Sequence, residues 1–150
     1  MQPSSFYEIE LKALLSQNQY KLLSIDLPKK MKLLNEETLH TRKFKTSTND
    51  DIRLRYSEKR FELVHKEGRA TDIARKELTI KLASKKEIDN FVTLLIKLNF
   101  FEDPSWITHR MDFEYPYDGY VYKVSLQHTE NFAYILEVEF AATSKEEIKV

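Results

Sequence analysis

The chain has 150 residues, of which 41% are hydrophobic and 32% are charged, and its formal net charge is zero. This length predicts one globular domain over residues 1–150, and the neutral charge gives no indication of a nucleic-acid or anionic-lipid partner. The absence of cysteine excludes disulfides and zinc–thiolate sites, and with only two glycines a glycine-rich phosphate loop is excluded. No signal sequence or membrane-spanning apolar run is recognisable, so we expect a cytoplasmic protein that is monomeric or homodimeric.

The first predicted element is a strand over Phe6–Ala13 with a strongly divided pattern. Because successive side chains of a strand point to opposite faces, its charged residues share one face and its mostly apolar residues share the other. The charged face consists of Glu8, Glu10 and Lys12. A similar alternation near the far end of the chain places Glu137 and Glu139 on one face of a later strand.

A short helix is expected after this strand, with Ser16 as its N-cap and Pro28 interrupting it. Residues 29–35 are predicted to add one or two further helical turns. A basic strand then covers residues 38–46, and a turn covers residues 47–50.

Three further strands are predicted over residues 51–56, 60–66 and 75–82. Each places basic side chains on one face: Arg53 and Arg55 on the first, Lys66 on the second and Arg75 on the third. Period two ends at Ser84, where apolar residues at helical spacing predict a helix over 84–99. Ser84 and Glu87 have the spacing of a capping box at its start.

The last three predicted strands cover residues 106–115, 120–128 and 132–142, with short antiparallel connections. The first has Thr108 and Arg110 on one face, and the second has Lys123 and Gln127 on one face. About eight antiparallel strands with flanking helices can close into a β-barrel, which removes exposed sheet edges. The alternation of side chains alone does not decide whether the charged faces point into the barrel or out to solvent. Charged faces ordinarily point outward.

The order of the charged residues resembles the CYTH superfamily of triphosphate tunnel metalloenzymes. Residues 8–12 match its Glu-x-Glu-x-Lys motif, and the later landmarks are Arg53-x-Arg55, Lys66, Arg75-x-Glu77, Arg110 and Glu137-x-Glu139. The resemblance extends from about Tyr7 to Phe140. It implies an α+β fold, an antiparallel eight-stranded barrel with flanking helices, in which these charges line the inside.

The resemblance also implies a site for a small-molecule triphosphate. Arginine forks bind phosphate oxygens in pairs, and Arg53, Arg55, Lys66, Arg75 and Arg110 are the expected clamp. Lys12 either binds phosphate or tunes the neighbouring glutamates, and Lys123 is a further candidate phosphate ligand. The expected ligands of Mg²⁺ or Mn²⁺, which suit all-oxygen sites, are Glu8, Glu10, Glu137 and Glu139.

Several positions depart from the superfamily pattern. Thr108 stands where a lysine is usual, Gln127 where an acidic residue is common, and Ala133 where a glycine is usual. The expected function is a metal-dependent triphosphatase. The alternatives are an adenylate cyclase of the class IV type and a noncatalytic binder of triphosphorylated ligands.

The aromatic residues and histidines have competing interpretations. Trp106 and the tyrosines at 115, 117, 120 and 122 can stack on a ring at the mouth of a tunnel, although core packing is the commoner role of such residues in strands. The four histidines lack the spacing of metal ligands.

Overall fold

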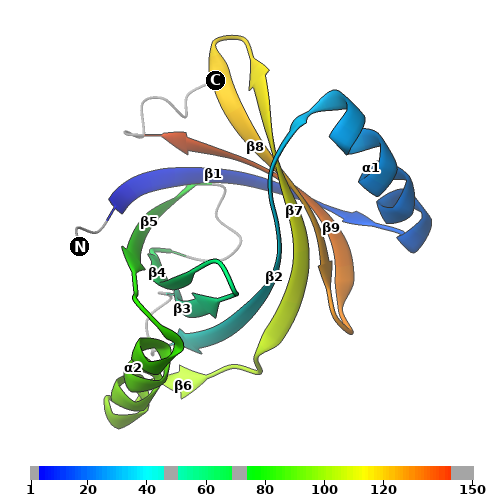
Figure 1. Ribbon diagram of the computed structural model, residues 1–150. Helices are drawn as coiled ribbons and strands as arrows, with labels where there is room; N and C mark the ends of the chain where they lie inside the picture. The colour runs from blue at the N-terminus through cyan, green and yellow to red at the C-terminus, as the bar shows by residue number, and fades with distance from the viewer. Residues whose placement is uncertain (1–3, 46–50, 69–73, 143–150) are drawn as a thin grey trace.

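The computed structural model describes residues 4–45, 51–68 and 74–142 (Figure 1). In these ranges the chain forms two helices and nine strands, with α1 after β1 and α2 between β5 and β6. Their bounds are β1 (Ser4–Leu15), α1 (Gln17–Lys30), β2 (Lys32–Lys45), β3 (Asp51–Tyr56), β4 (Phe61–Lys66), β5 (Ala74–Lys81), α2 (Lys85–Lys97), β6 (Phe101–Glu102), β7 (Trp106–Tyr117), β8 (Tyr120–Thr129) and β9 (Ala133–Ala142).

The strands form one antiparallel sheet that closes on itself. Its order is β3-β4-β5-β1-β9-β8-β7-β2, and β2 pairs back onto β3 to complete an eight-stranded barrel. The two-residue β6, which the sequence did not predict, pairs with the end of β2 outside this ring. The predicted eight-stranded antiparallel barrel with flanking helices is therefore confirmed (Figure 1).

The apolar core lies outside the barrel wall, beneath the two helices. Helix α2 places Ile88, Val92 and Leu95 against Phe44 of β2 and Leu54 of β3. Helix α1 places Leu27 against a second cluster formed by Phe113, Val124 and Leu126 of β7 and β8. Because strand side chains alternate, burying the apolar residues under the helices directs their charged neighbours into the barrel.

Helix α1 differs from its prediction at its C-terminal end. Pro28 does not interrupt the helix, which continues to Lys30 and closes with the Met31 N–H donating to the Leu27 carbonyl at 2.9 Å. Of the helical turns predicted over residues 29–35, only residues 29 and 30 are helical, because β2 begins at Lys32 and pairs there with β7. Sheet pairing overrides the local preference here.

The helix starts were predicted more accurately. Ser16 caps α1 as expected, and Gln19 completes a capping box by accepting from the Ser16 N–H at 2.8 Å. At α2, Ser84 accepts from the Glu87 N–H, but the Glu87 carboxylate accepts from Ala83 instead of Ser84, so the predicted box is only half formed.

Two sequence predictions, the turn at residues 47–50 and the strand end at Thr46, lie outside the described residues. Within the described ranges, neither helix combines the length and the apolar character that crossing a membrane requires.

The packing of α2 on the barrel gives a testable prediction. Ile88 is fully buried, so Ile88→Ala should lower the free energy of unfolding by about 2–5 kcal/mol through lost burial and a residual cavity. Ile96 lies on the same helix with 53% of its surface exposed, and Ile96→Ala should change stability by only about 0.5 kcal/mol. Urea denaturation of both variants measures the difference, and equal losses would contradict this packing.

Candidate active site

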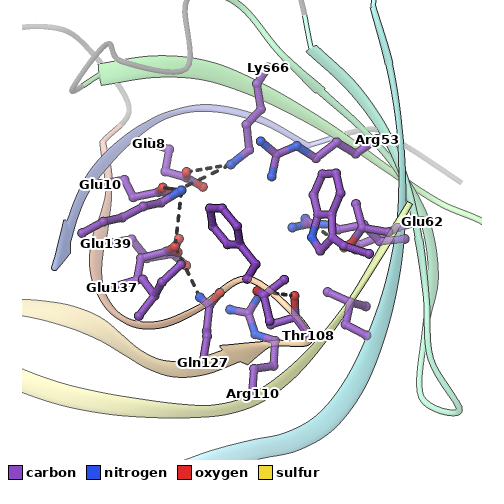
Figure 2. Close-up of a pocket in the computed structure, with 18 of the residues that line it drawn as sticks. Glu8, Glu10, Arg53, Glu62, Lys66, Thr108, Arg110, Gln127, Glu137 and Glu139 are labelled. Carbon is purple, nitrogen blue, oxygen red and sulfur yellow. Dashed lines mark hydrogen bonds and ion pairs between the residues drawn. The ribbon is translucent and has the colours of Figure 1, made fainter. Parts of the chain in front are cut away.

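The inside of the barrel contains a cavity of about 580 Å³ lined mainly by polar and charged side chains. Figure 2 shows Glu8, Glu10, Glu137 and Glu139 along one side, with Arg53 and Glu62 on the opposite side. Lys66 and Arg110 extend into the space between these two sides (Figure 2). The charged faces of the strands therefore point inward, as the resemblance implied and contrary to the ordinary arrangement.

Three carboxylates converge where β1 and β9 pair. Glu10 and Glu139 are direct partners across this pair, and Glu8 is two residues before Glu10 on the same face. One carboxylate oxygen from each of these three residues lies within 4.8 Å of the others. We call Glu8, Glu10 and Glu139 the carboxylate cluster.

The carboxylate cluster has the chemistry of a hard-cation site. Burial, reinforced by the negative charges of Glu8, Glu137 and Glu10, raises the pKa of Glu139 to about 8, although Arg110 opposes this. Carboxylates held this close repel one another, and a divalent cation bound among them would offset that repulsion. An all-oxygen donor set suits Mg²⁺ or Mn²⁺, so the residues present fit the expected ion.

Glu137, the fourth predicted metal ligand, is directed elsewhere. Its carboxylate accepts a hydrogen bond from the Gln127 amide at 3.3 Å and lies 3.9 Å from the Lys12 ammonium. The same Gln127 amide donates to Ser125 at 3.1 Å. An acidic residue at position 127 would be unable to donate this bond when ionised, so glutamine at this position stabilises Glu137 against the barrel wall.

Two lysines flank the carboxylate cluster. The Lys66 ammonium donates to Glu8 at 3.1 Å and lies 3.8 Å from Glu10 and 3.7 Å from Glu77. Lys12, which is half exposed, pairs with Glu10 at 2.8 Å. Both lysines therefore neutralise glutamates of the cluster, and both line the cavity.

Two arginines of the expected clamp are each held by an aspartate on their own strand. Arg53 donates to Asp51 on β3, and Arg110 donates to Asp112 on β7, with a shortest distance of 2.8 Å in each case. Burial alone would raise the pKa of both aspartates, but the hydrogen bond and charge of the neighbouring arginine hold each pKa below its ordinary value. The pairs fix the direction of both guanidinium groups.

A further network lies on the wall opposite the carboxylate cluster. Arg55 pairs with Glu62 at 2.9 Å, and Arg60 lies 3.3 Å from the same carboxylate. Arg60 also pairs with buried Glu37, which accepts from the Ser57 hydroxyl at 2.6 Å. Arg55, Arg60 and Glu62 all line the cavity.

The remaining predicted residues occupy different places. Arg75 is directed to Asp51 at 3.4 Å and to the backbone carbonyls of Glu67 and Gly68, at the edge of the site. Lys123 lines the cavity and is the β8 partner of Glu139. Thr108, in place of the usual lysine, is buried and shares a hydrogen bond with Thr129 at 3.1 Å.

Sequence reasoning missed several residues of the site, among them the charged Asp51, Arg60 and Glu62 and the aromatic Phe132. The alternation of side chains along a strand could have identified three of them, because Asp51 shares a face with Arg53, and Arg60 and Glu62 share a face with Lys66. Phe132 follows a turn, where alternation gives no information.

Acidic and basic groups balance in the cavity. Seven acidic and seven basic residues line it among the described residues. The acidic ones are Glu8, Glu10, Glu62, Glu77, Glu130, Glu137 and Glu139, and the basic ones are Lys12, Arg53, Arg55, Arg60, Lys66, Arg110 and Lys123. The cavity by itself therefore has little net attraction for a polyanion.

Comparison with known proteins supplies structural relatives only. No protein-family model matches the chain, and no curated protein matches it in sequence. The PH1819 protein from Pyrococcus horikoshii is similar in structure, with a TM-score of 0.72 and 19% identity over 94% of this chain and 81% of that one.

Two similar structures are described as candidate adenylate cyclases. The one from Vibrio parahaemolyticus has a TM-score of 0.67 and 13% identity, covering 95% of this chain and 80% of its own. The one from Bacillus halodurans has a TM-score of 0.58 and 19% identity, covering 95% of this chain and 84% of its own. At these identities the likeness shows a shared fold.

The aspartate of β3 gives a testable pH dependence. Asp51 is buried against Arg53, Arg75 and Lys43, so Asp51→Asn should lower the free energy of unfolding at pH 7 by about 3–5 kcal/mol. The depressed pKa of Asp51 contributes stability that is present above its unfolded pKa, about 3.9, and is lost as pH falls through the folded pKa.

Urea denaturation between pH 7 and pH 2.5 should therefore show the deficit of Asp51→Asn shrinking below about pH 4. Asp26→Asn, an exposed change on α1, is the matched control and should cost little at any pH. A deficit that stays constant with pH would show that Asp51 is not a paired carboxylate.

Proposed function

Because the chain has the CYTH-like barrel fold seen in candidate adenylate cyclases, we propose that it is a metal-dependent hydrolase of a triphosphate bound inside the barrel. One observation carries the proposal: three converging carboxylates and a set of inward arginines and lysines face the same 580 Å³ cavity. A polyphosphate bridged to a hard cation needs both kinds of group within reach of one ligand.

The charge balance of the cavity supports the need for a metal. A triphosphate carries several negative charges, and seven acidic lining residues oppose seven basic ones. When bound among Glu8, Glu10 and Glu139, Mg²⁺ or Mn²⁺ would supply positive charge and Lewis-acid activation for attack on phosphorus. Glu137, which accepts from Gln127 and lies 3.9 Å from the Lys12 ammonium, lines the same cavity beside these three ligands.

The basic side chains would hold and orient the phosphate chain. Arg53 and Arg110 are directed by their aspartates, and each guanidinium has five N–H donors, so donors remain for phosphate oxygens after the aspartate is bound. Lys66, a member of the clamp, also contacts Glu8 of the carboxylate cluster, so it lies next to both the phosphate chain and the metal in this proposal. No side-chain nucleophile is required, because water attacks the terminal phosphorus while the clamp stabilises the departing diphosphate.

The proposal is tested at the carboxylate cluster. Purified protein with Mg²⁺ or Mn²⁺ should release phosphate from tripolyphosphate or an organic triphosphate, and Glu139→Gln should lower kcat by about 100-fold or more because it removes a metal ligand. Glu58→Gln, an exposed change in the β3–β4 turn, should leave kcat unchanged.

Three results would replace the proposal. Cyclic AMP formed from ATP would indicate a cyclase, and tight binding without product would indicate a noncatalytic binder. Phosphate release that survives in Glu139→Gln would remove the carboxylate cluster from the reaction.

The charge balance makes a separate prediction about binding. Tripolyphosphate should raise the melting temperature much more when Mg²⁺ or Mn²⁺ is present, because the cavity without metal has little excess of positive charge even with Glu139 protonated. In EDTA most of the rise should be lost. Glu62→Gln, which leaves Arg55 and Arg60 in partial excess, should restore weak tripolyphosphate binding in EDTA. Equal stabilisation with and without metal in the unmodified protein would contradict this account.

A further inference from the structure

A second cavity, of about 720 Å³, lies on the outer side of the barrel wall. The residues of β2 and β7 that line it include Thr38, His40, His109 and Met111. These four alternate along their strands with residues that line the interior cavity, so they face outward. Tyr20 of α1 and the β3–β4 turn complete the lining. We call this cavity the outer pocket, and its volume suits a small ligand.

Several rings give the outer pocket an aromatic surface. Tyr20, His40, Tyr56 and His109 all line it, and His40 stacks on Tyr56 with ring centroids 4.9 Å apart. The Lys85 ammonium lies 4.9 Å from the centre of the Tyr56 ring. The face of a tyrosine ring attracts cations, and here it already holds an ammonium of the protein itself. This surface suits a positively charged ligand that also has an apolar part.

The charge of the outer pocket also favours a cation. Three glutamates and two bases line it among the described residues. The Lys59 ammonium donates to the Asn35 amide oxygen at 2.8 Å and to the Glu36 backbone carbonyl at 2.7 Å. The other base, Arg110, donates to Asp112. Both bases are therefore directed to partners of their own, and carboxylate charge remains for a ligand.

Glu36 places one of these carboxylates beside helix α1. It is exposed, and it lines the outer pocket together with Tyr20. Burial, followed by electrostatic interaction with Tyr134 and Glu36, raises the pKa of Tyr20 above its ordinary value. Glu36 is therefore close enough to Tyr20 for its charge to be felt there. A cation between them would meet a negative charge and an aromatic ring together.

Glu37 connects the outer pocket to the interior cavity. It lines the outer pocket and is the β-ladder partner of Arg110, which lines both cavities. Its buried carboxylate accepts from the Ser57 hydroxyl at 2.6 Å and pairs with Arg60, which lines the interior cavity. Positive charge added in the outer pocket would therefore act on residues that face the interior.

We propose that the outer pocket binds a small organic cation, an ammonium or guanidinium ligand with an apolar part, between Glu36, Tyr20 and Tyr56. The bound cation would attract a triphosphate across the wall that contains Glu37 and Arg110. Because coupling between two binding sites is reciprocal, each ligand would strengthen the binding of the other. The cation site does not depend on the proposed function, whereas the coupling rests on it.

The test of the site uses benzylamine as the probe. Benzyl alcohol, which has nearly the same shape without the charge, is its control. Benzylamine added at constant pH and ionic strength should shift the proton NMR signals of the His40 and His109 rings, which line the outer pocket. It should leave unshifted the signals of His65, a residue of β4 that lines neither cavity. Benzyl alcohol should cause much smaller shifts at the same concentrations.

A pair of variants tests the carboxylate. Glu36→Gln should raise the half-saturating concentration of benzylamine roughly 3-fold, the scale of one exposed ion pair. Asp26→Asn removes the same charge from an exposed position of α1 outside the outer pocket and should leave that concentration unchanged. Equal shifts with benzyl alcohol, equal shifts at His65, or an unchanged half-saturation in Glu36→Gln would overturn the site.

The coupling is measured with tripolyphosphate in Mg²⁺ by isothermal titration calorimetry. Saturating benzylamine should lower the half-saturating concentration of tripolyphosphate about 5-fold relative to sodium chloride at the same ionic strength. An unchanged concentration with benzylamine bound would overturn the coupling. Failure of the unmodified protein to bind tripolyphosphate would overturn the proposed function and the coupling with it, while the histidine signals would still decide whether the outer pocket binds the cation.

Discussion

A closed barrel that directs its charged strand faces inward must pair those charges with one another. Burying an unpaired charge costs several kcal/mol, so each inward cation needs a carboxylate or a ligand within reach. The structure meets this constraint with pairs that come from the same strand, such as Arg53 with Asp51, and from neighbouring strands, such as Arg55 with Glu62. The hydrophobic core is then displaced to the outside of the wall, where α1 and α2 cover it.

This pairing determines what the interior can bind. Arginines already held by aspartates present their guanidinium groups in fixed directions, which lowers the entropy lost when phosphate oxygens bind them. The carboxylates of Glu8, Glu10 and Glu139 lie close together, and burial, together with repulsion from the neighbouring glutamates, raises the pKa of Glu139. The interior thus has a place for added positive charge beside places for added negative charge, which is the pattern a metal–polyphosphate complex requires.

The departures from the CYTH pattern have local physical consequences. Gln127 donates to Glu137, which an ionised acidic residue could not do, and Thr108 pairs with Thr129 where a lysine would add a positive charge. Arg60, which lines the cavity beside Arg55, adds a cation on the opposite wall. Trp106 lies beside Arg53, whose guanidinium carbon is 5.8 Å from the centre of the ring, so the same cavity lining also contains an aromatic surface.

The sequence alone determined the strand faces, because side chains alternate along any strand whatever the fold. This alternation places Glu8 and Glu10 on the same face of one strand, and it assigns Arg53 and Arg110 each to one face of their own strands. The sequence also predicted the barrel, both helix N-caps and, through resemblance, the inward direction of the charges. Tertiary structure decided the rest, because those features depend on pairing between distant segments: β2 replaced the predicted helical turns after Lys30, and Glu137 turned to Gln127. The β8–β9 turn is tied to β7 by the Glu130 N–H, which donates to the Ile107 carbonyl at 3.0 Å, a contact that no local pattern encodes.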